Sequence, residues 1–296
     1  MSRTAAILLV LLSALGFGSI ALFAKVAYAS GVNPSALLAL RFVLAVAILA
    51  PIVWAKRLAL PRGRTLAGYV LMGCLYTAQA QSYFNALLHA SSGLVALLLY
   101  IYPILVTLFA LMLGWEKADR RTLILMSVAC VGLAITLGGK LQGQPLGIAL
   151  GILAATIYAV YILLGNRLAH NTHPLSASLV ILATAGCGNT ALAFAGHASL
   201  PGSLTGWLAV SAIALFSTAM AITAFLTGVK KIGASQASIL STLEPVITLT
   251  IGVALLGETA SASQLFGGAT VLIAVALLAQ KPAPIVQVHE GTALAG

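Results

Sequence analysis

Charged residues are scarce in this sequence of 296 residues, because Asp, Glu, Lys and Arg together make up only 7% of it. A soluble domain keeps roughly a quarter of its residues charged, so this chain has too few charged groups to cover a water-exposed surface. Hydrophobic residues account for 61% of the chain. The composition therefore excludes an ordinary soluble domain and predicts that lipid surrounds most of the protein.

Acidic residues are especially few, five in all, which leaves a formal net charge of +10. Such an excess of positive charge can indicate nucleic-acid binding, but that function requires basic residues on a solvated face. Here the Lys and Arg residues lie mainly between long apolar runs. We therefore expect no nucleic-acid partner.

Cysteine and catalytic motifs are also rare. Cys74, Cys130 and Cys187 all lie inside apolar runs without a CxxC spacing, so we expect neither a disulfide framework nor a zinc site. The sequence contains no HExxH, GxSxG or Walker motif, and its histidines form no ligand cluster. These absences predict a protein that is not an enzyme and that uses no metal or other cofactor.

Long apolar runs, separated by short polar connections, make up most of the chain. A helix needs about 20 apolar residues to cross the hydrocarbon of a bilayer. The first run is longer than the core of a signal peptide, so we interpret it as an uncleaved span. The sequence predicts ten membrane-spanning helices, at residues 4–28, 34–54, 65–86, 92–113, 121–138, 145–167, 174–196, 204–229, 235–256 and 261–280.

The basic residues alternate strongly between the two sides of this arrangement. The connections on one side hold nearly all the Lys and Arg residues, whereas the other side holds only Lys140. Lys25 and Arg41 lie within spans. Because basic connections stay in the cytoplasm, we expect both termini there, in a multi-pass protein of the bacterial inner (plasma) membrane.

Two parts of the sequence match at a constant offset of 142 residues. Residues 92–116 and 234–258 both open with small residues, and Pro103 matches Pro245. At the same offset, Glu116 and Glu258 also match.

This duplication predicts the overall organisation of the chain. Each half would hold five helices, an odd number, so the two halves would cross the membrane in opposite orientations. The expected fold is an all-α membrane protein with ten transmembrane helices in two inverted five-helix repeats, residues 1–140 and 141–281, followed by a disordered cytoplasmic tail, residues 282–296. Inverted repeats of this kind build many secondary transporters, with the substrate site near the middle of the membrane.

The residues 86–116 and 229–258 share a signature of small residues, a mid-helix proline and an apolar stretch that ends near Glu. In this signature the chain resembles the drug/metabolite transporter superfamily, and within it proteins with two EamA-type repeats. Among these it is most similar to the YddG-like amino-acid exporters of bacterial inner membranes. The resemblance implies a ten-helix exporter of small metabolites. The chain departs from symmetry where Tyr102 precedes Pro103 but Glu244 precedes Pro245.

Pro103 and Pro245 lie at matching points of the fourth and ninth predicted spans. A proline inside a helix removes a backbone hydrogen bond and bends the helix. We interpret the pair as hinges for alternating access. The structural alternative is that prolines are simply common in membrane helices, where neighbouring helices satisfy the freed carbonyls.

Several tyrosines fall near the middle of predicted spans, although membrane tyrosines usually lie at the interfaces. A hydroxyl group at that depth needs a partner, which either a polar cavity or a hydrogen bond between packed helices would provide. We interpret these tyrosines, with other aromatic and polar residues, as the lining of a substrate cavity. The predicted cavity residues are Phe17, Tyr76, Gln79, Tyr83, Tyr100, Tyr102, Tyr158, Tyr161, Phe216, Met220, Ser241 and Glu244.

Glu244 is the only carboxyl group deep in an apolar run. An ionisable group at such a depth is costly and indicates function, often a proton relay or a cation site. A protonated Glu244 bonded to a carbonyl freed by Pro245 is the structural alternative. Arg41 is a possible charge partner for Glu244 or for a substrate carboxylate, or its side chain could extend to the membrane surface.

Together these features predict a secondary transporter that exports amino acids, aromatic ones included, or related small metabolites by alternating access. The alternative is a proton-coupled efflux pump for multiple drugs or cationic compounds, with Glu244 as the site of the proton and the cation. The expected partners are a small-molecule substrate and the lipid bilayer. Ten helices can enclose a cavity within one chain, so a monomer would be sufficient.

Overall fold

The structure is a computed structural model that describes residues 1–86, 89–90, 92–115, 120–137, 143–169, 172–195, 198–256 and 261–279. The described residues are helical almost throughout, with a single isolated β-bridge between Ala90 and Gly143 and no strand. The all-α fold predicted from the sequence is therefore confirmed for this part of the chain. Glu116, Lys140, Glu258 and the predicted tail, 282–296, lie outside the described residues.

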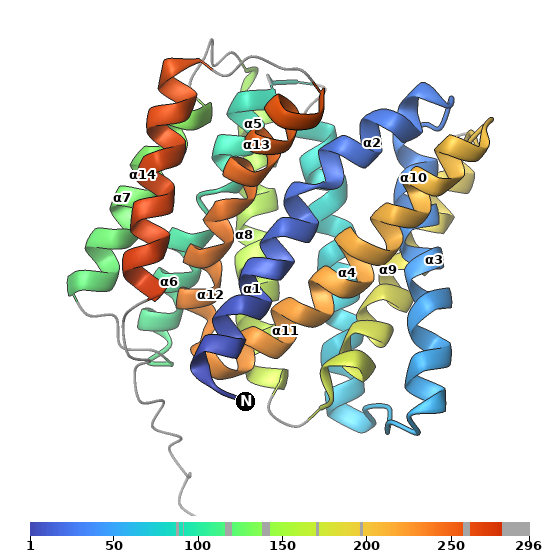
Figure 1. Cartoon of the computed structure of the whole chain (residues 1–296). Coiled ribbons are helices and arrows are strands. Elements are labelled where there is room, and N and C mark those ends of the chain that lie inside the picture. Colours follow the sequence, from blue (N-terminus) through green and yellow to red (C-terminus); the bar gives the residue numbers. More distant parts are fainter. Residues whose placement is uncertain are drawn as a thin grey trace, which may run out of the picture.

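The helices follow one another along the chain with short connections (Figure 1). The chain first forms α1 (Arg3–Gly18), α2 (Ile20–Ala29), α3 (Pro34–Ala55), α4 (Gly63–Ala86), α5 (Ser92–Leu99), α6 (Tyr102–Met112) and α7 (Arg120–Leu137). It continues with α8 (Pro145–Leu168), α9 (Pro174–Ala195), α10 (Leu204–Ala214), the π-helix η2 (Leu215–Met220), α11 (Ala221–Ile232), α12 (Ala234–Leu240), the 3₁₀ turn η3 (Ser241–Leu243), α13 (Glu244–Leu256) and α14 (Ala262–Ala279).

Six helical stretches of the described chain are long and apolar enough to cross a membrane. They are Arg3–Ala29, Pro34–Ala55, Pro145–Leu168, Pro174–Ala195, Leu204–Ile232 and Ala234–Leu255.

Local sequence explains where several of these helices begin. The side chain of Asn33 accepts a hydrogen bond from the backbone N–H of Ala36 at 2.9 Å, which satisfies a free donor of the first turn of α3. Ser203 does the same for α10. Pro145 and Pro174 occupy the first positions of α8 and α9, where a missing N–H costs no hydrogen bond.

Two helical stretches are broken beside the prolines that the repeat pairs. The helix α5 ends at Leu99 and α6 begins at Tyr102, just before Pro103. In the matching stretch, η3 separates α12 from α13, and α13 begins at Glu244, just before Pro245. A proline fits the first turn of a helix better than its interior, so each proline stands where a new helix starts.

Two further irregularities carry no proline, and the sequence does not predict them. The helices α1 and α2 are separate at Ser19, and η2 interrupts the stretch 204–232. The Ser19 hydroxyl donates a hydrogen bond to the Gly16 carbonyl at 2.8 Å and lies 3.2 Å from the Ser217 hydroxyl of η2. A serine that bonds to the preceding turn bends its helix, so the two irregular segments meet at a polar contact.

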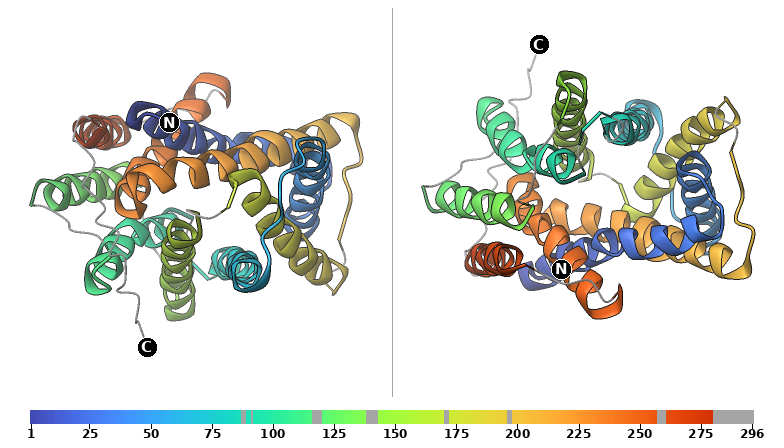
Figure 2. Two further views of the ribbon diagram at one scale, coloured as in Figure 1. Left: turned by 90° about the horizontal axis from the view of Figure 1, so that it is seen from below. Right: turned by 90° about the horizontal axis from the view of Figure 1, so that it is seen from above.

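The helices pack as two crossing pairs between two outer groups. At one end of the molecule α7 lies against α14, and at the other end α3 packs against α9 and α10 (Figure 1). Between these groups, α1 packs against α11 and α4 packs against α8. Figure 2, which looks along the helices, shows that these two pairs lie on opposite sides of the molecule.

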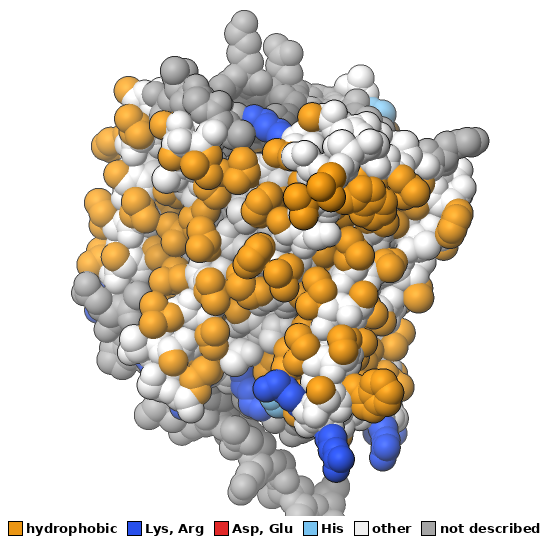
Figure 3. Space-filling view, turned by 45° about the vertical axis from the view of Figure 1, so that its right-hand side comes forward, with side chains coloured by type: hydrophobic (Ala, Val, Ile, Leu, Met, Phe, Trp, Pro, Cys, Tyr) orange, Lys and Arg blue, Asp and Glu red, His pale blue; other side chains and the backbone are white. Residues whose placement is uncertain are grey.

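Large apolar side chains cover the outside of the molecule, whereas many interior positions hold alanine. Leu8, Leu265 and Ile273 are about 60% exposed, at 60%, 61% and 59%. Figure 3 shows a face on which hydrophobic side chains extend over most of the height, with Lys and Arg gathered mainly at the lower edge. Small residues inside and large apolar residues outside are typical of helices that associate within lipid.

Polar side chains also join helices in the interior. Asn189 of α9 donates through its side-chain amide to the Thr77 hydroxyl of α4 at 3.4 Å and to its own helix at the Ala185 carbonyl at 2.9 Å. The Gln81 amide donates to the side-chain oxygen of Asn189 at 3.3 Å. These bonds fix the register between α4, which lines the central cavity, and α9, which packs behind it.

Gly73 allows α4 to approach α9 closely, so we predict that Gly73→Ala destabilises the protein. An added Cβ would lie 2.5 Å from Thr184 Cβ and 2.7 Å from the Ile181 carbonyl oxygen, and backbone cannot move aside cheaply. Overpacking of this kind costs about 1–3 kcal/mol, which thermal unfolding of the detergent-purified protein would measure. The matched control is Gly186→Ala, whose Cβ would make an ordinary 3.5 Å contact with Phe42. Equal melting temperatures for the two variants would contradict this account of the packing.

Candidate functional site: a central polar and aromatic cavity

A cavity of about 380 Å³ lies in the middle of the helical bundle. Its volume falls in the range of roughly 300–1,000 Å³ that is usual for small-molecule sites. The helices α1, α2, α3, α4, α5, α8 and α13 all contribute to its lining. The lining residues are Phe17, Ile20, Leu38, Arg41, Phe42, Tyr76, Gln79, Ala80, Tyr83, Ala96, Leu99, Tyr100, Tyr158, Glu244, Pro245 and Thr248.

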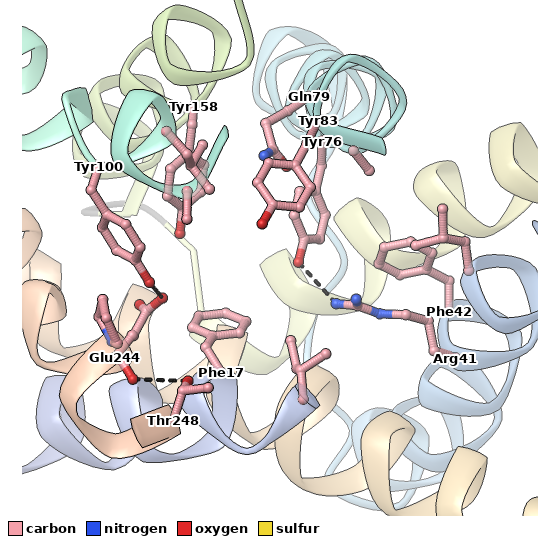
Figure 4. A pocket seen from close by; sticks show the side chains of 16 residues that line it. Phe17, Arg41, Phe42, Tyr76, Gln79, Tyr83, Tyr100, Tyr158, Glu244 and Thr248 are labelled. Atoms are coloured by element: carbon pink, nitrogen blue, oxygen red, sulfur yellow. Dashed lines mark hydrogen bonds between the residues drawn. The ribbon is translucent and has the colours of Figure 1, made fainter. Parts of the chain in front are cut away.

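Many of the residues proposed from the sequence lie in this lining. Tyr76, Gln79 and Tyr83 follow the spacing of a single face of α4, and all three reach the cavity (Figure 4). The other sequence-predicted residues in the lining are Phe17, Tyr100, Tyr158 and Glu244, together with the hinge candidate Pro245 and the charge-partner candidate Arg41.

Two of the predicted tyrosines lie behind the lining rather than in it. The ring of Tyr102 meets the ring of Tyr158 edge to face, with centroids 4.7 Å apart, and its hydroxyl donates to the Ser238 carbonyl at 3.4 Å. Tyr161 stacks on Tyr76 at 5.5 Å and on Tyr158 at 5.9 Å. Both residues therefore hold lining tyrosines in place, which corresponds to the packed-core alternative for these positions.

Four other predicted residues also lie outside the lining. Ser241 is only 2% exposed and Pro103 is buried, both within the packed interior. Phe216 is 47% exposed on the outside of η2, while Met220 lies near Gly16 of α1. Because α1 packs directly across η2 and α11, it separates these side chains from the cavity.

The structure adds lining residues that the sequence analysis does not name. Thr248 lies one helical turn after Glu244, and its spacing in the sequence points to the same face of the helix. The others are mainly apolar, and in a membrane sequence such residues cannot be distinguished from core or lipid-facing positions. The additional residues are Ile20, Leu38, Phe42, Ala80, Ala96, Leu99 and Thr248.

Arg41 forms the positive part of the cavity wall. It is only 8% exposed, and its Nη2 atom donates a hydrogen bond to the Tyr76 hydroxyl oxygen at 3.1 Å. The guanidinium carbon lies 4.8 Å from the centre of the Phe42 ring, within the range of a cation–π contact. These contacts hold the side chain within the cavity wall, so Arg41 is not extended to the membrane surface.

Glu244, the first residue of α13, provides the only carboxyl group in the described lining of the cavity. The Tyr100 hydroxyl donates a hydrogen bond to its Oε2 atom at 3.3 Å (Figure 4). Thr248 donates both to the Glu244 backbone oxygen at 3.1 Å and to the Gly18 carbonyl at 2.8 Å. A Cβ on Gly18 would lie 2.9 Å from the Glu244 carbonyl oxygen, so this glycine allows α1 to support the broken helix closely.

Below the cavity, toward the N-terminal end of the molecule, a second aromatic and aliphatic layer is closely packed. Tyr161, Ile222 and Phe225 surround a space of only about 10 Å³ beneath Phe17 and Tyr76. This layer separates the cavity from the ends of α8 and α11. Within the described residues, no cluster of His, Cys, Asp and Glu is arranged to hold a metal ion.

An apolar helical bundle whose central cavity is lined by aromatic side chains and a few polar groups is typical of membrane proteins that handle small molecules. The profile of the EamA-like transporter family matches the chain twice, over residues 4–138 and over residues 145–280. The chain therefore belongs to the EamA-like transporter family and is a multi-pass membrane transporter.

Individual relatives agree with this assignment. The chain is 28% identical to an uncharacterized transporter of Archaeoglobus fulgidus over 72% of its own length and 75% of that protein. It is 27% identical to the uncharacterized transporter YcbK of Bacillus subtilis over 85% of each chain. It is also 27% identical to the uncharacterized inner membrane transporter YedA of Escherichia coli, over 74% of its own length and 72% of that protein.

A solved protein crystal structure shares the fold. The TM-score is 0.83 at 21% sequence identity, and the match covers 94% of this chain and 99% of the other.

The position of the cavity predicts which face of α5 is accessible to water-soluble reagents. In a background whose three native cysteines are replaced by Ala, we expect Ala96→Cys to react with a charged thiosulfonate reagent, because Ala96 lines the cavity. The matched control is the neighbouring Val95→Cys, since Val95 is 0% exposed and does not line it. Mass spectrometry of the purified protein would measure labelling. Equal labelling at both positions would show that α5 does not face an aqueous cavity as described.

Proposed function

We propose that this protein is a secondary transporter that exports amino acids, aromatic ones included, or related small metabolites across the bacterial inner membrane by alternating access. The observation that carries the proposal is the position of the cavity. Helices α1 to α5 come from the first family match, and α8 and α13 come from the second. A site shared by two halves is accessible to each side of the membrane in turn when the halves rock against each other.

The helix positions support two equivalent halves, residues 1–140 and 141–281. An offset of 142 residues carries α7 (Arg120–Leu137) onto α14 (Ala262–Ala279), and it carries Arg3 at the start of α1 onto Pro145 at the start of α8. The same offset carries α1 onto α8, and it carries α4 onto the stretch that contains α11. It therefore relates the packed pair α1 and α11 to the packed pair α8 and α4, which are the two crossing pairs of the fold. This exchange is expected for two interlocked five-helix repeats that are inverted relative to each other.

The distribution of charge supports an orientation with both termini in the cytoplasm. The C-terminal ends of α3 and α11 lie at the same end of the molecule as the N-terminus (Figure 1). Lys56 and Arg57 follow α3, and Lys230 and Lys231 belong to the last turn of α11, and basic residues favour the cytoplasmic side. The cavity lies above the closely packed layer around Tyr161, away from that end. In this orientation the cavity is nearer the outer face of the membrane.

The lining favours substrates with an aromatic or apolar part and a polar part. Tyrosine and phenylalanine rings face the cavity from α1, α3, α4 and α8, and Tyr100 adds another ring between α5 and α6. Such walls bind apolar side chains by contact, while a few convergent polar groups orient the ligand. One chain provides the whole cavity, so the monomer is sufficient for the proposed activity.

One observation favours the second candidate, a proton-coupled efflux pump for cationic compounds or multiple drugs. Glu244 lines the cavity, and an intramembrane carboxylate can bind a cation or a proton. However, Arg41 lines the same cavity and would repel a substrate that carries only positive charge. The presence of both charges therefore favours the amino-acid transporter.

Counterflow in liposomes tests the proposed function. Purified protein should exchange several radiolabelled amino acids saturably, with mutual competition, and an imposed proton gradient would reveal coupling. We expect Ala96→Trp, which fills the cavity, to abolish this flux, whereas Val131→Trp on the exposed surface of α7 should retain it. If no amino acid moves but a lipophilic cation is driven by the proton gradient, the efflux-pump function replaces this one.

The hinge role proposed for Pro103 and Pro245 gives a separate prediction. Pro245→Ala should restore a backbone donor at the broken helix and stiffen it, so we expect about tenfold slower counterflow with nearly unchanged substrate affinity. Pro51→Ala is the control, because Pro51 lies inside α3 on the exposed surface, away from the cavity. Equal rates for the wild type and Pro245→Ala would contradict a hinge at this position.

A further inference from the structure

The cavity holds an arginine and a glutamate on two different walls. Arg41 comes from α3 and Glu244 from the start of α13, and Figure 4 shows them on opposite sides of the pocket. They are the only Arg, Lys, Asp or Glu side chains in the described lining. Their contacts are with separate tyrosines and not with each other. A buried charge without an opposite charge beside it is costly, so both ends of the cavity are suited to a charged ligand.

Arg41 and Tyr76 together present hydrogen-bond donors to the cavity. Tyr76 uses its oxygen to accept from Arg41, so its own O–H proton remains to be donated. The Arg41 Nε–H is buried and has no hydrogen-bond partner among the described residues. Guanidinium and hydroxyl donors placed together match the two oxygens of a carboxylate, which form short, charge-assisted hydrogen bonds with arginine.

The Glu244 end has the opposite polarity. Tyr100 donates its proton to Glu244 Oε2, so the phenol oxygen retains lone pairs that can accept. Within the described part of the chain, Glu244 Oε1 has no hydrogen-bond partner. The Thr248 proton is directed at the backbone of Gly18 and Glu244, which leaves the Thr248 hydroxyl oxygen as a further acceptor. Several acceptors around one negative charge match a primary ammonium group, which has three protons to donate.

We infer that the cavity binds its substrate as a zwitterion with a fixed direction. The substrate carboxylate binds Arg41 and Tyr76, and the substrate ammonium binds Glu244 and Tyr100. The rest of the substrate lies against the aromatic wall that includes Phe17 and Tyr158. The assignment rests on the proposed function and narrows it to molecules that carry both charges, such as free amino acids. Amines, simple cations and carboxylic acids are excluded.

The exclusion follows from the cost of leaving one charge unpaired. An amine without a carboxylate would satisfy Glu244 but bring a positive charge into a cavity that still holds an unpaired Arg41. A carboxylic acid without an amine would leave Glu244 unpaired. A site built around specific polar groups rejects an analogue that lacks one of them by a factor of roughly 100 or more. Removing the unmatched protein charge should therefore restore binding of the matching analogue.

Binding of three related probes to the purified full-length protein tests this orientation. The probes are phenylalanine, phenethylamine (which lacks the carboxylate) and 3-phenylpropionate (which lacks the ammonium), titrated in detergent by thermal shift. The wild type should bind phenylalanine at least about 100-fold more tightly than either analogue. Arg41→Gln should lose about 100-fold in phenylalanine affinity and bind phenethylamine more tightly than the wild type. Glu244→Gln should show the reverse preference, for 3-phenylpropionate.

The improved binding of one analogue shows that each variant is folded, so loss of phenylalanine binding cannot be attributed to misfolding. Lys25→Gln is the charge-matched control, since Lys25 lies on the exposed side of α2 and does not line the cavity, and its probe preferences should equal those of the wild type. Wild-type amino-acid flux combined with equal losses for all three probes in both variants would overturn the orientation and leave the transporter function standing. Absence of amino-acid binding and flux in the wild type would overturn both.

Discussion

Backbone hydrogen bonding within lipid is the constraint on which the rest of this structure depends. A helix satisfies its own N–H and C=O groups, and irregular backbone at membrane depth is tolerated only where protein or a water-filled cavity surrounds it. The described breaks follow this rule, because η2 is packed among α1, α3, α10 and α11, and the other three breaks lie beside the cavity. Ser19 separates the lining residues Phe17 and Ile20, Tyr100 itself lies in the gap between α5 and α6, and Glu244 follows η3 directly. The same irregularities that break the helices thus bring polar side chains to the centre of the molecule.

The ionisable side chains inside the membrane are under a similar constraint, because each needs a hydrogen-bond partner. Each of the two buried charges is paired with a tyrosine of matching polarity, Arg41 with an acceptor and Glu244 with a donor. Close glycine contacts at Gly18 and the interior polar bonds of Asn189 fix the helices that carry these side chains. The packed aromatic layer behind them, with Tyr102 and Tyr161, supports the lining tyrosines through ring contacts. A ligand would therefore meet a site whose donors and acceptors are already oriented, which reduces the ordering cost of binding.

Sequence reasoning named about half of the residues that line the cavity, because it relied on depth within apolar runs. That criterion finds polar groups such as Gln79 and Glu244, which are costly in lipid unless they serve a structural or functional role. It cannot separate a tyrosine that faces a cavity from one whose hydroxyl bonds to a neighbouring helix, as Tyr102 does. It also gives no weight to Leu38 or Ala96, since apolar side chains are favourable on every face of a membrane helix. Phe216 and Met220 do not line the cavity, because they belong to the π-helix η2 and α1 packs across this segment. No local sequence pattern predicts either feature.

By itself, the sequence determined that this protein lies in a lipid bilayer, that it is helical and approximately where its helices begin and end. Composition and run length decide these properties, because transfer of each side chain and each backbone group into lipid is nearly independent of the rest of the fold. The repeat at an offset of 142 residues also marked in advance the two prolines where helices break. Only the tertiary structure decided which buried groups share a cavity and which face one another. Arg41 and Glu244 are about 200 residues apart in sequence, and their placement on opposite walls depends on packing between helices, in which many small contacts act together.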